Sequence, residues 1–418
     1  MTMSRGLSAM GVRNYRLFWS GQLISLVGTW MDSVAQSWLI LLLTHDPVAL
    51  GLRAVFQFMP VMVLGLFGGI IADTLPKRAT LYVTQAGSGL VALTLGVLTL
   101  TGTVQVWHIY VLATILGSIN AVDMPVRQSF VVEMVGREHV VNAVALNSAT
   151  FNGARIIGPA VGGVLIGAVG VGLCFMLNAA SYLAVLAALF LMHEVELHPA
   201  TRSPMPHSPR AVVEQLAEGL RYVRRTPSVL LAILVLGIVS TVALNFSVLM
   251  PLYAADSLHG DASTYGYLMA AAGVGSLVAA LLIAFGLRPT LRLLVSGSAL
   301  IGLALVGLAF SPLLLVSLPI MVLLGFATIT MSATTNTLIQ LQVPDALRGR
   351  VMSVYTTVFA GTTPIGGLAS GIAAAMAGVT ATLLVAGSLT LVTAGAAVTR
   401  LGGTARAGAA QAPPEPLA

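Results

Sequence analysis

A row of five polar side chains near the N-terminus contains one carboxylate and shares one face of an expected helix. The five residues are Gln22, Ser25, Thr29, Asp32 and Gln36. Steps of three and four residues bring side chains to one face, because an α-helix turns once every 3.6 residues. The apolar segment around them, Leu17 to Leu43, is long enough to cross the roughly 30 Å hydrocarbon core of a bilayer.

Asp32 lies near the middle of this segment, where a charge is costly unless it is paired, hydrated or protonated. Two interpretations of the polar row remain open. It can be a seam of hydrogen bonds between packed helices, or it can line a water-filled path for a proton or another cation. We favour the path. Asp32 is assigned to proton coupling, and the other four residues of the row are assigned to a substrate cavity.

The composition indicates an integral membrane protein. Of 418 residues, 57% are hydrophobic and 8% are charged, and the mean hydropathy is +0.94. A soluble domain carries about 25% charged residues. The single cysteine, Cys174, excludes an internal disulfide. The net charge of +6 does not indicate nucleic-acid binding, because the basic residues lie at the ends of apolar segments.

Twelve apolar segments predict an all-α protein with two pseudo-symmetric bundles of six transmembrane helices. The segments are expected at 17–43, 48–71, 79–101, 107–124, 141–168 and 171–192, and at 228–253, 264–286, 291–310, 313–339, 350–375 and 378–399. The N-terminal bundle would occupy 1–192 and the C-terminal bundle 228–400. The linker 193–227 would contain an amphipathic surface helix from Arg210 to Arg225. The tail, 401–418, is predicted to be disordered.

Eighteen of the twenty lysines and arginines fall on one side of this topology. The loops on the other side hold Asp46, Asp256 and Asp261. Because basic loops stay in the cytoplasm, we expect both termini to be cytoplasmic in a multi-pass protein of the bacterial cell membrane. The exceptions are Arg53 and Arg155. Arg53 is expected to snorkel toward the membrane surface, with anion binding as the alternative.

The loop between the second and third segments reads GIIADTLPKR and holds an acid followed by two basic residues. It resembles the signature loop of the major facilitator superfamily, with Thr74 replacing a basic residue and Pro76 replacing glycine. Asp73 is expected to contact the positive end of a helix in the other bundle and to latch the outward-open state. The alternative is a plain turn whose basic residues set topology. The residues assigned to this cytoplasmic gate are Gly69, Asp73, Lys77, Arg78, Asp123 and Arg127.

The fifth segment contains Gly158-Pro159 and Gly162-Gly163. This pattern resembles the antiporter signature of drug-exporting members of the superfamily, with Ala154 replacing a glycine. Proline removes a backbone hydrogen bond, and glycines let a neighbouring helix approach closely. We therefore expect this segment to bend and to seal against its neighbours.

Residues 120–128, 142–147 and 343–351 resemble the branch of the superfamily that contains the enterobactin exporter and macrolide efflux proteins. The resemblance covers the chain except the linker and tail, and it implies twelve helices, a rocking mechanism, proton-driven export and a monomer. In that fold the helices of Asp32 and Arg155 are neighbours, so it also implies an ion pair between them. The pair would serve proton coupling or, as the alternative, only fix helix packing.

The second bundle has no acid or base at membrane depth other than tyrosine. Its hydroxyl, amide and aromatic side chains are expected to contact a bulky, partly apolar substrate, or alternatively to serve packing alone. The residues assigned to the substrate cavity outside the first segment are Asn120, Asn245, Asn336 and Thr362.

No pattern typical of an enzyme is present in the sequence. The one lysine, Lys77, follows a proline, so there is no phosphate-binding loop of an ATPase, and the seven histidines lack metal-ligand spacing. We predict no catalytic residue, metal or cofactor. The predicted partners are a small-molecule substrate, protons and the lipid bilayer. The favoured function is proton-coupled export of a drug-like compound or siderophore by alternating access; an importer or symporter and a lipid flippase are the alternatives.

Overall fold

The computed structural model describes residues 8–198 and 209–410, apart from the side chains of 66–74, 209–213, 215, 346 and 401–410. Within these residues the regular structure is entirely helical. The helices of the first half are α2 (Arg13–Thr44), α3 (Pro47–Thr74), α4 (Lys77–Leu100), α5 (Val106–Val169) and α6 (Val171–Phe190). Those of the second half are α8 (Pro227–Ala243), α9 (Phe246–Leu252), α10 (Ala262–Ala284), α11 (Leu291–Ala309), α12 (Leu314–Gln342) and α13 (Asp345–Ala410).

Two of these helices are too long for one membrane crossing. α5 has 64 residues and α13 has 66, and each turns at a glycine with a left-handed backbone, Gly136 (φ 67°) and Gly378 (φ 81°). Only glycine adopts this conformation readily. Ten described segments are long and apolar enough to span a membrane. Dividing α5 and α13 at these glycines would give twelve segments, which is the number of crossings predicted.

The predicted loop between the fourth and fifth crossings is wrong. Residues 125–140 are helical except at Gly136, so the turn is confined to one residue. The predicted seventh crossing, in contrast, is interrupted. α8 ends at Ala243, α9 begins at Phe246, and a π-helical turn, Tyr253–Ser257, follows.

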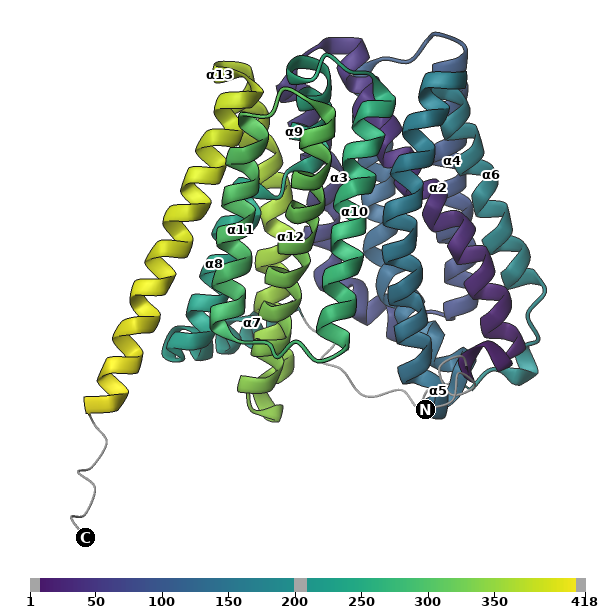
Figure 1. Cartoon of the computed structure of the whole chain (residues 1–418). Helices are drawn as coiled ribbons and strands as arrows, with labels where there is room; N and C mark the ends of the chain where they lie inside the picture. Colours follow the sequence, from purple (N-terminus) through teal and green to yellow (C-terminus); the bar gives the residue numbers. More distant parts are fainter. Residues whose placement is uncertain (1–7, 199–208, 411–418) are drawn as a thin grey trace.

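The two halves of the chain lie on opposite sides of the molecule (Figure 1), with α2, α4 and α6 on one side and α8, α11 and α13 on the other. We call the end where α2 and α4 begin, with Arg13 and Lys77, the basic end. The opposite end, with Asp46 and Asp261 between helices, is the acidic end. α13 also finishes at the basic end (Figure 1).

Glycines bring the two halves together near the acidic end. A methyl group added to Gly163 in α5 would lie 2.8 Å from the Cα of Gly266 in α10. A methyl group added to Gly51 in α3 would lie 2.7 Å from the carbonyl oxygen of Gly367 in α13. Helices without side chains at a crossing approach until their backbones touch, which is the usual way of packing in lipid. The halves are therefore closed against each other at this end.

Toward the basic end the same face of α5 is uncovered. Val141 and Pro159 are separated by five full helical turns, so their side chains point in the same direction. Pro159 is buried against Gly266 of α10, whereas Val141 is 84% exposed, and Ser148 between them is also exposed. The halves separate on this side, so the structure is open toward the basic end.

The linker helix α7 (Pro209–Arg225) covers the predicted stretch from Arg210 to Arg225. It packs on the start of α13, where Gly219 meets the backbone of Arg350 and Glu218 forms an ion pair with the Arg350 side chain. α13 remains helical to Ala410, within the segment 401–418 that was predicted to be disordered. Residues 411–418 of that segment lie outside the described residues.

Candidate transport site

The polar row on α2 points into the first half of the protein. Gln22, Ser25, Asp32 and Gln36 are each at most 6% exposed, whereas Thr29 is exposed. Gly28 lies beside this row, and a methyl group there would lie 2.6 Å from the Ser181 hydroxyl oxygen of α6. α2 therefore packs tightly on α6, and the row lies inside the helix bundle. Asp32 does not face lipid.

A buried cluster joins Asp32 to Arg53 of α3. Gln36 donates from Nε2 to Asp32 Oδ2 (2.6 Å) and accepts at Oε1 from Arg53 Nε (3.0 Å). Arg53 also donates to the Ser37 hydroxyl at 3.4 Å. Arg53 is 3% exposed, so the prediction that it snorkels to the membrane surface is wrong. Gln36 instead bridges the Arg53 guanidinium and the Asp32 carboxylate.

The second half reaches this cluster through Tyr265 of α10. The Tyr265 ring stacks on Trp38 of α2, with centroids 6.5 Å apart and an interplanar angle of 23°. The Tyr265 hydroxyl also forms a hydrogen bond with the Ser37 side chain. The Asp32–Gln36–Arg53 cluster therefore borders the closed contact between the two halves.

A second buried cluster lies around Asp123, nearer the basic end. Asp123 Oδ1 accepts from the Thr84 hydroxyl (2.7 Å) and from Gln85 Nε2 (2.8 Å), and its other oxygen pairs with Arg127. Arg127 donates in turn to Gln22 Oε1 of the α2 row at 2.7 Å. Asp123 and Arg127 were assigned to a gate loop, and this placement is wrong: both lie on helix α5, and Asp123 is 1% exposed.

The two clusters and the α2 row together form a polar column through the first half, from Asp123 to Arg53. We use the term polar column for the residues Asp123, Arg127, Gln22, Ser25, Thr29, Asp32, Gln36 and Arg53. The Asp32 carboxylate also forms a hydrogen bond with the Asn178 side chain of α6. Three other buried side-chain atoms in or beside the column have no hydrogen-bond partner among the described residues: Gln22 Nε2, Gln85 Oε1 and Arg127 Nε. Buried polar atoms are normally paired, so these three mark positions suited to a transient partner.

The predicted ion pair between Asp32 and Arg155 is not formed in this structure. The Arg155 guanidinium lies over the Trp30 ring, 5.6 Å from its centroid, and no described acid pairs with it. The physical reason is the direction of the two side chains. Asp32 points into the first half with the polar row, whereas Trp30, two residues earlier on α2, faces α5.

The glycines of the fifth crossing serve two contacts. A methyl group on Gly158 would lie 2.4 Å from Cβ of Trp30, and Gly162 lies against Met31, both in α2. Pro159 and Gly163 contact Gly266 in α10. The expected tight seal is therefore present, on two sides of one helix.

Two of the substrate-cavity residues predicted outside α2 serve packing in this conformation. Asn245 is 3% exposed, donates to the Thr241 carbonyl (2.7 Å) at the break after α8, and contacts Gly366. Thr362 is 7% exposed and its hydroxyl bonds to the Phe359 carbonyl at 2.7 Å. Asn336 accepts from Gln340 at 2.5 Å, and Asn120 is half-buried.

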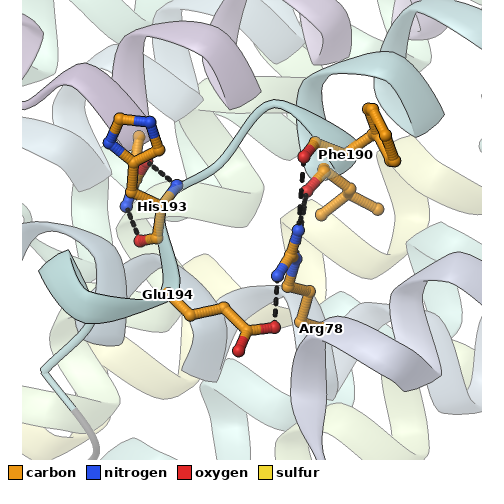
Figure 2. Close-up of polar contacts among 6 residues, drawn as sticks. Arg78, Phe190, His193 and Glu194 are labelled. Carbon is orange, nitrogen blue, oxygen red and sulfur yellow. Dashed lines mark hydrogen bonds and ion pairs between the residues drawn. The ribbon is translucent and has the colours of Figure 1, made fainter.

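The basic residues of the gate loop hold the first half together at the basic end. Lys77 pairs with Glu133 of α5. Arg78 donates to the last carbonyls of α6, to Leu189 at 2.7 Å and to Phe190 at 3.4 Å, and it pairs with Glu194 (Figure 2). The side chain of Asp73 and the surroundings of Gly69 lie outside what the structure describes, so the predicted latch stays a prediction.

We expect an Arg78→Ala variant to melt at a lower temperature than the wild type in detergent. The variant loses a charge-assisted cap on the C-terminal carbonyls of α6, worth about 2 kcal/mol. A fluorescence melting curve measures the change. Glu194→Gln is the control, because an acid whose side chain is 75% exposed contributes little to the pair. Equal melting temperatures for Arg78→Ala and wild type would contradict the capping role.

The family model described as transmembrane secretion effector matches residues 4–414, nearly the whole chain. The chain belongs to this family of the major facilitator superfamily. Relatives of this chain include the staphyloferrin A transporter of Staphylococcus aureus. The two are 26% identical over 380 residues, which cover 90% of this chain and 93% of the relative. The enterobactin exporter EntS of Escherichia coli is 27% identical over 347 residues, covering 82% and 80%.

Solved structures confirm the fold of this secretion-effector family member. A POT family peptide transporter matches with a TM-score of 0.75 at 13% identity, over 95% of each chain. A bacterial homologue of the lysosomal transporter Spinster, in an inward-facing conformation, matches with a TM-score of 0.69 at 12% identity, over 96% of each chain. The protein is a multi-pass membrane transporter of the major facilitator type and not an enzyme.

Four residues in or beside the polar column were not predicted as site residues: Arg53, Thr84, Gln85 and Tyr265. The sequence contains one indication for Arg53, because it is one of two basic residues that do not lie on the basic side of the predicted topology. Thr84 and Gln85 are uncharged, and nothing in their sequence positions indicates a role in the site. Tyr265 lies in the other half of the chain, and only the contact between the halves brings it to Ser37.

Proposed function

We propose that this protein exports a small molecule, of the siderophore or drug-like class, in exchange for protons. The polar column carries this proposal. It contains two carboxylates, Asp32 and Asp123, buried inside the first half. Arg127 connects Asp123 to Gln22, and Gln22 shares one face of α2 with Asp32. A carboxylate inside the membrane costs free energy that helix packing alone does not require. Acids in such positions are typical of proton relays.

Asp32 is the proposed coupling carboxylate. Gln36 links it to the buried Arg53, which borders the closed contact with Tyr265 of the other half. A protonated Asp32 no longer attracts Arg53, so the protonation state changes the stability of the cluster beside the closed contact. Proton binding is in this way coupled to opening and closing, as alternating access requires.

We propose that the basic end faces the cytoplasm, following the distribution of lysine and arginine. The open side seen here then receives substrate from the cytoplasm. The rocking units would be residues 1–192 and 228–400, held by the linker 193–227, in a monomer. In the opposite conformation Asp73 would latch the basic end, with Gly69 allowing the close approach.

The siderophore class is supported by two relatives, a staphyloferrin A transporter and an enterobactin exporter. Multidrug export is the neighbouring possibility on the same fold. The transported molecule would contact Thr29, which is the exposed member of the α2 row, and Asn336 of the second half.

The experiment is transport in proteoliposomes with an imposed pH gradient, using a panel of siderophores and drugs. Outward movement of a panel member that requires the gradient supports proton-coupled export. Uptake in the same direction as the proton would instead indicate a symporter. Movement of labelled phospholipid between leaflets, without transport of any soluble compound, would indicate a flippase, and gradient-independent movement would remove the proton from the mechanism.

A further inference from the structure

We propose that Arg155 is the anchor for an anionic group of the substrate, so that the transported molecule carries an oxyanion beside a planar apolar part. This inference rests on the proposed transport function and adds a substrate class to it. It starts from the position of Arg155 on α5, between the two contacts that this helix makes with its neighbours.

Arg155 points toward the space between the two halves. Gly158 contacts α2 and Pro159 contacts α10. At 100° per residue, Arg155 lies about 60° from Gly158 and about 40° from Pro159, on the arc between them. Ile157, on the other side of α5, is 49% exposed toward the lipid. The guanidinium is therefore directed inward. At this level α10 still packs on α5, since a methyl group on Gly273 would lie 3.0 Å from the Arg155 carbonyl oxygen, and the uncovered part of the same face begins toward Ser148.

The interior cations of the first half differ in their partners. Arg127 pairs with Asp123, and Arg53 is hydrogen-bonded to Gln36 and Ser37. Arg155 has no acid and no hydrogen-bond acceptor among the described residues. An arginine presents five N–H donors in a planar fork that matches a carboxylate or another oxyanion. A half-buried guanidinium at membrane depth with all of these donors free is suited to a mobile anion.

Aromatic rings fix the neighbouring part of the site. Trp30 lies beneath the Arg155 guanidinium, and its ring packs edge-on against Phe151 with centroids 5.6 Å apart. Phe151 is 47% exposed. A planar apolar group next to the anion can stack on these rings, which adds affinity that a bare inorganic anion lacks. Lipophilic cations, in contrast, would be repelled by Arg155.

Ligand-induced stabilisation of the purified full-length protein tests this inference without a proton gradient. The probes are salicylate and citrate as anions, salicylamide as the neutral counterpart, and tetraphenylphosphonium as a lipophilic cation. We expect salicylate to raise the melting temperature of the wild type more than citrate, which lacks a planar ring, and more than salicylamide, which lacks the charge. Arg155→Gln should weaken the apparent affinity for these anions about 10- to 100-fold.

Three further variants keep the test decisive if Arg155→Gln folds poorly. Arg155→Lys keeps the charge without the planar fork and should retain part of the stabilisation. Asn152→Asp places an acid one turn before Arg155 on the same face and should abolish anion binding while the arginine remains. Arg292→Gln, an exposed arginine at the start of α11, should behave as wild type.

The inference is overturned if no anion stabilises the wild type, if salicylamide or tetraphenylphosphonium stabilises it as well as salicylate does, or if anion stabilisation survives both Arg155→Gln and Asn152→Asp. Its failure is separable from that of the proposed function. If the protein exports a cation with the proton gradient, the transport function is supported and the anion site is refuted. If anions bind in an Arg155-dependent way but no proton-driven transport occurs, the anion site is supported and proton coupling is refuted.

Discussion

An Asp32→Asn variant should lose proton-driven export by about 100-fold or more, the range in which removal of a proton-transferring group usually falls. Asparagine keeps the size of the side chain and can still bond with Gln36, so the fold and the α2–α6 packing should persist. It cannot release a proton. Substrate exchange across the membrane without a gradient should therefore continue, because binding and rocking remain possible.

The measurement is efflux from proteoliposomes with and without a pH gradient, with substrate exchange recorded on the same preparation. Asp256→Asn is the matched control, since Asp256 is an exposed acid in the π-helical turn Tyr253–Ser257 of the second half and does not belong to the polar column. Gradient-driven efflux at the wild-type rate in Asp32→Asn would remove Asp32 from proton coupling. Asp123→Asn would then become the next variant to measure, because Asp123 is the other acid of the column.

A Gly163→Val variant should reduce transport by more than tenfold by preventing the halves from closing at the acidic end. A side chain at this position meets three backbone atoms of α10, with Gly266 Cα at 2.8 Å and Ala262 O at 2.9 Å. Backbone atoms cannot move aside as a flexible side chain can, so overpacking of this kind costs about 1–3 kcal/mol. That cost falls on the conformation closed at the acidic end and shifts the population away from it.

Cysteine labelling reports this shift directly. In a Cys174→Ser background, Val141→Cys places a thiol at a site that is 84% exposed on the open side. Gly163→Val should slow its labelling from the basic end as well as reduce transport. Gly153→Val on the same helix is the control, because nothing lies within 4 Å of a methyl group at Gly153. If Gly163→Val labels and transports as Gly153→Val does, the glycine contact does not govern closing.

Much of the local structure follows from the sequence. Apolar length predicted the membrane crossings, because a helix in lipid must satisfy its own backbone hydrogen bonds over the whole thickness. The three–four spacing placed Gln22, Asp32 and Gln36 on one face of α2, and these side chains are buried together. The Gly-Pro pattern of the fifth crossing predicted close packing, which is present at Gly158 and Gly163.

Pairing between distant residues did not follow from the sequence. Asp32 and Arg155 were paired because their helices are neighbours, but a helix has several faces, and neighbouring helices do not bring every polar residue together. Arg53 was expected at the membrane surface because it lies near the end of its predicted crossing. It is instead buried and hydrogen-bonded to Gln36 and Ser37. Residues 125–140 were expected to form a loop that contains the basic residues Arg127 and Arg137, because charge usually marks a membrane surface, but they are helical except at Gly136.

By itself the sequence determined that this is a helical membrane protein with one face of its first helix polar, since burial in lipid depends on local composition and helical period. Only the tertiary structure decided which charges are compensated. The free energy of a buried charge depends on partners that the fold brings from other helices, as Gln36 does for Arg53 and Asp123 for Arg127. Arg155 has no acid partner among the described residues, and this difference from Arg127 depends on how helices from distant parts of the chain are arranged.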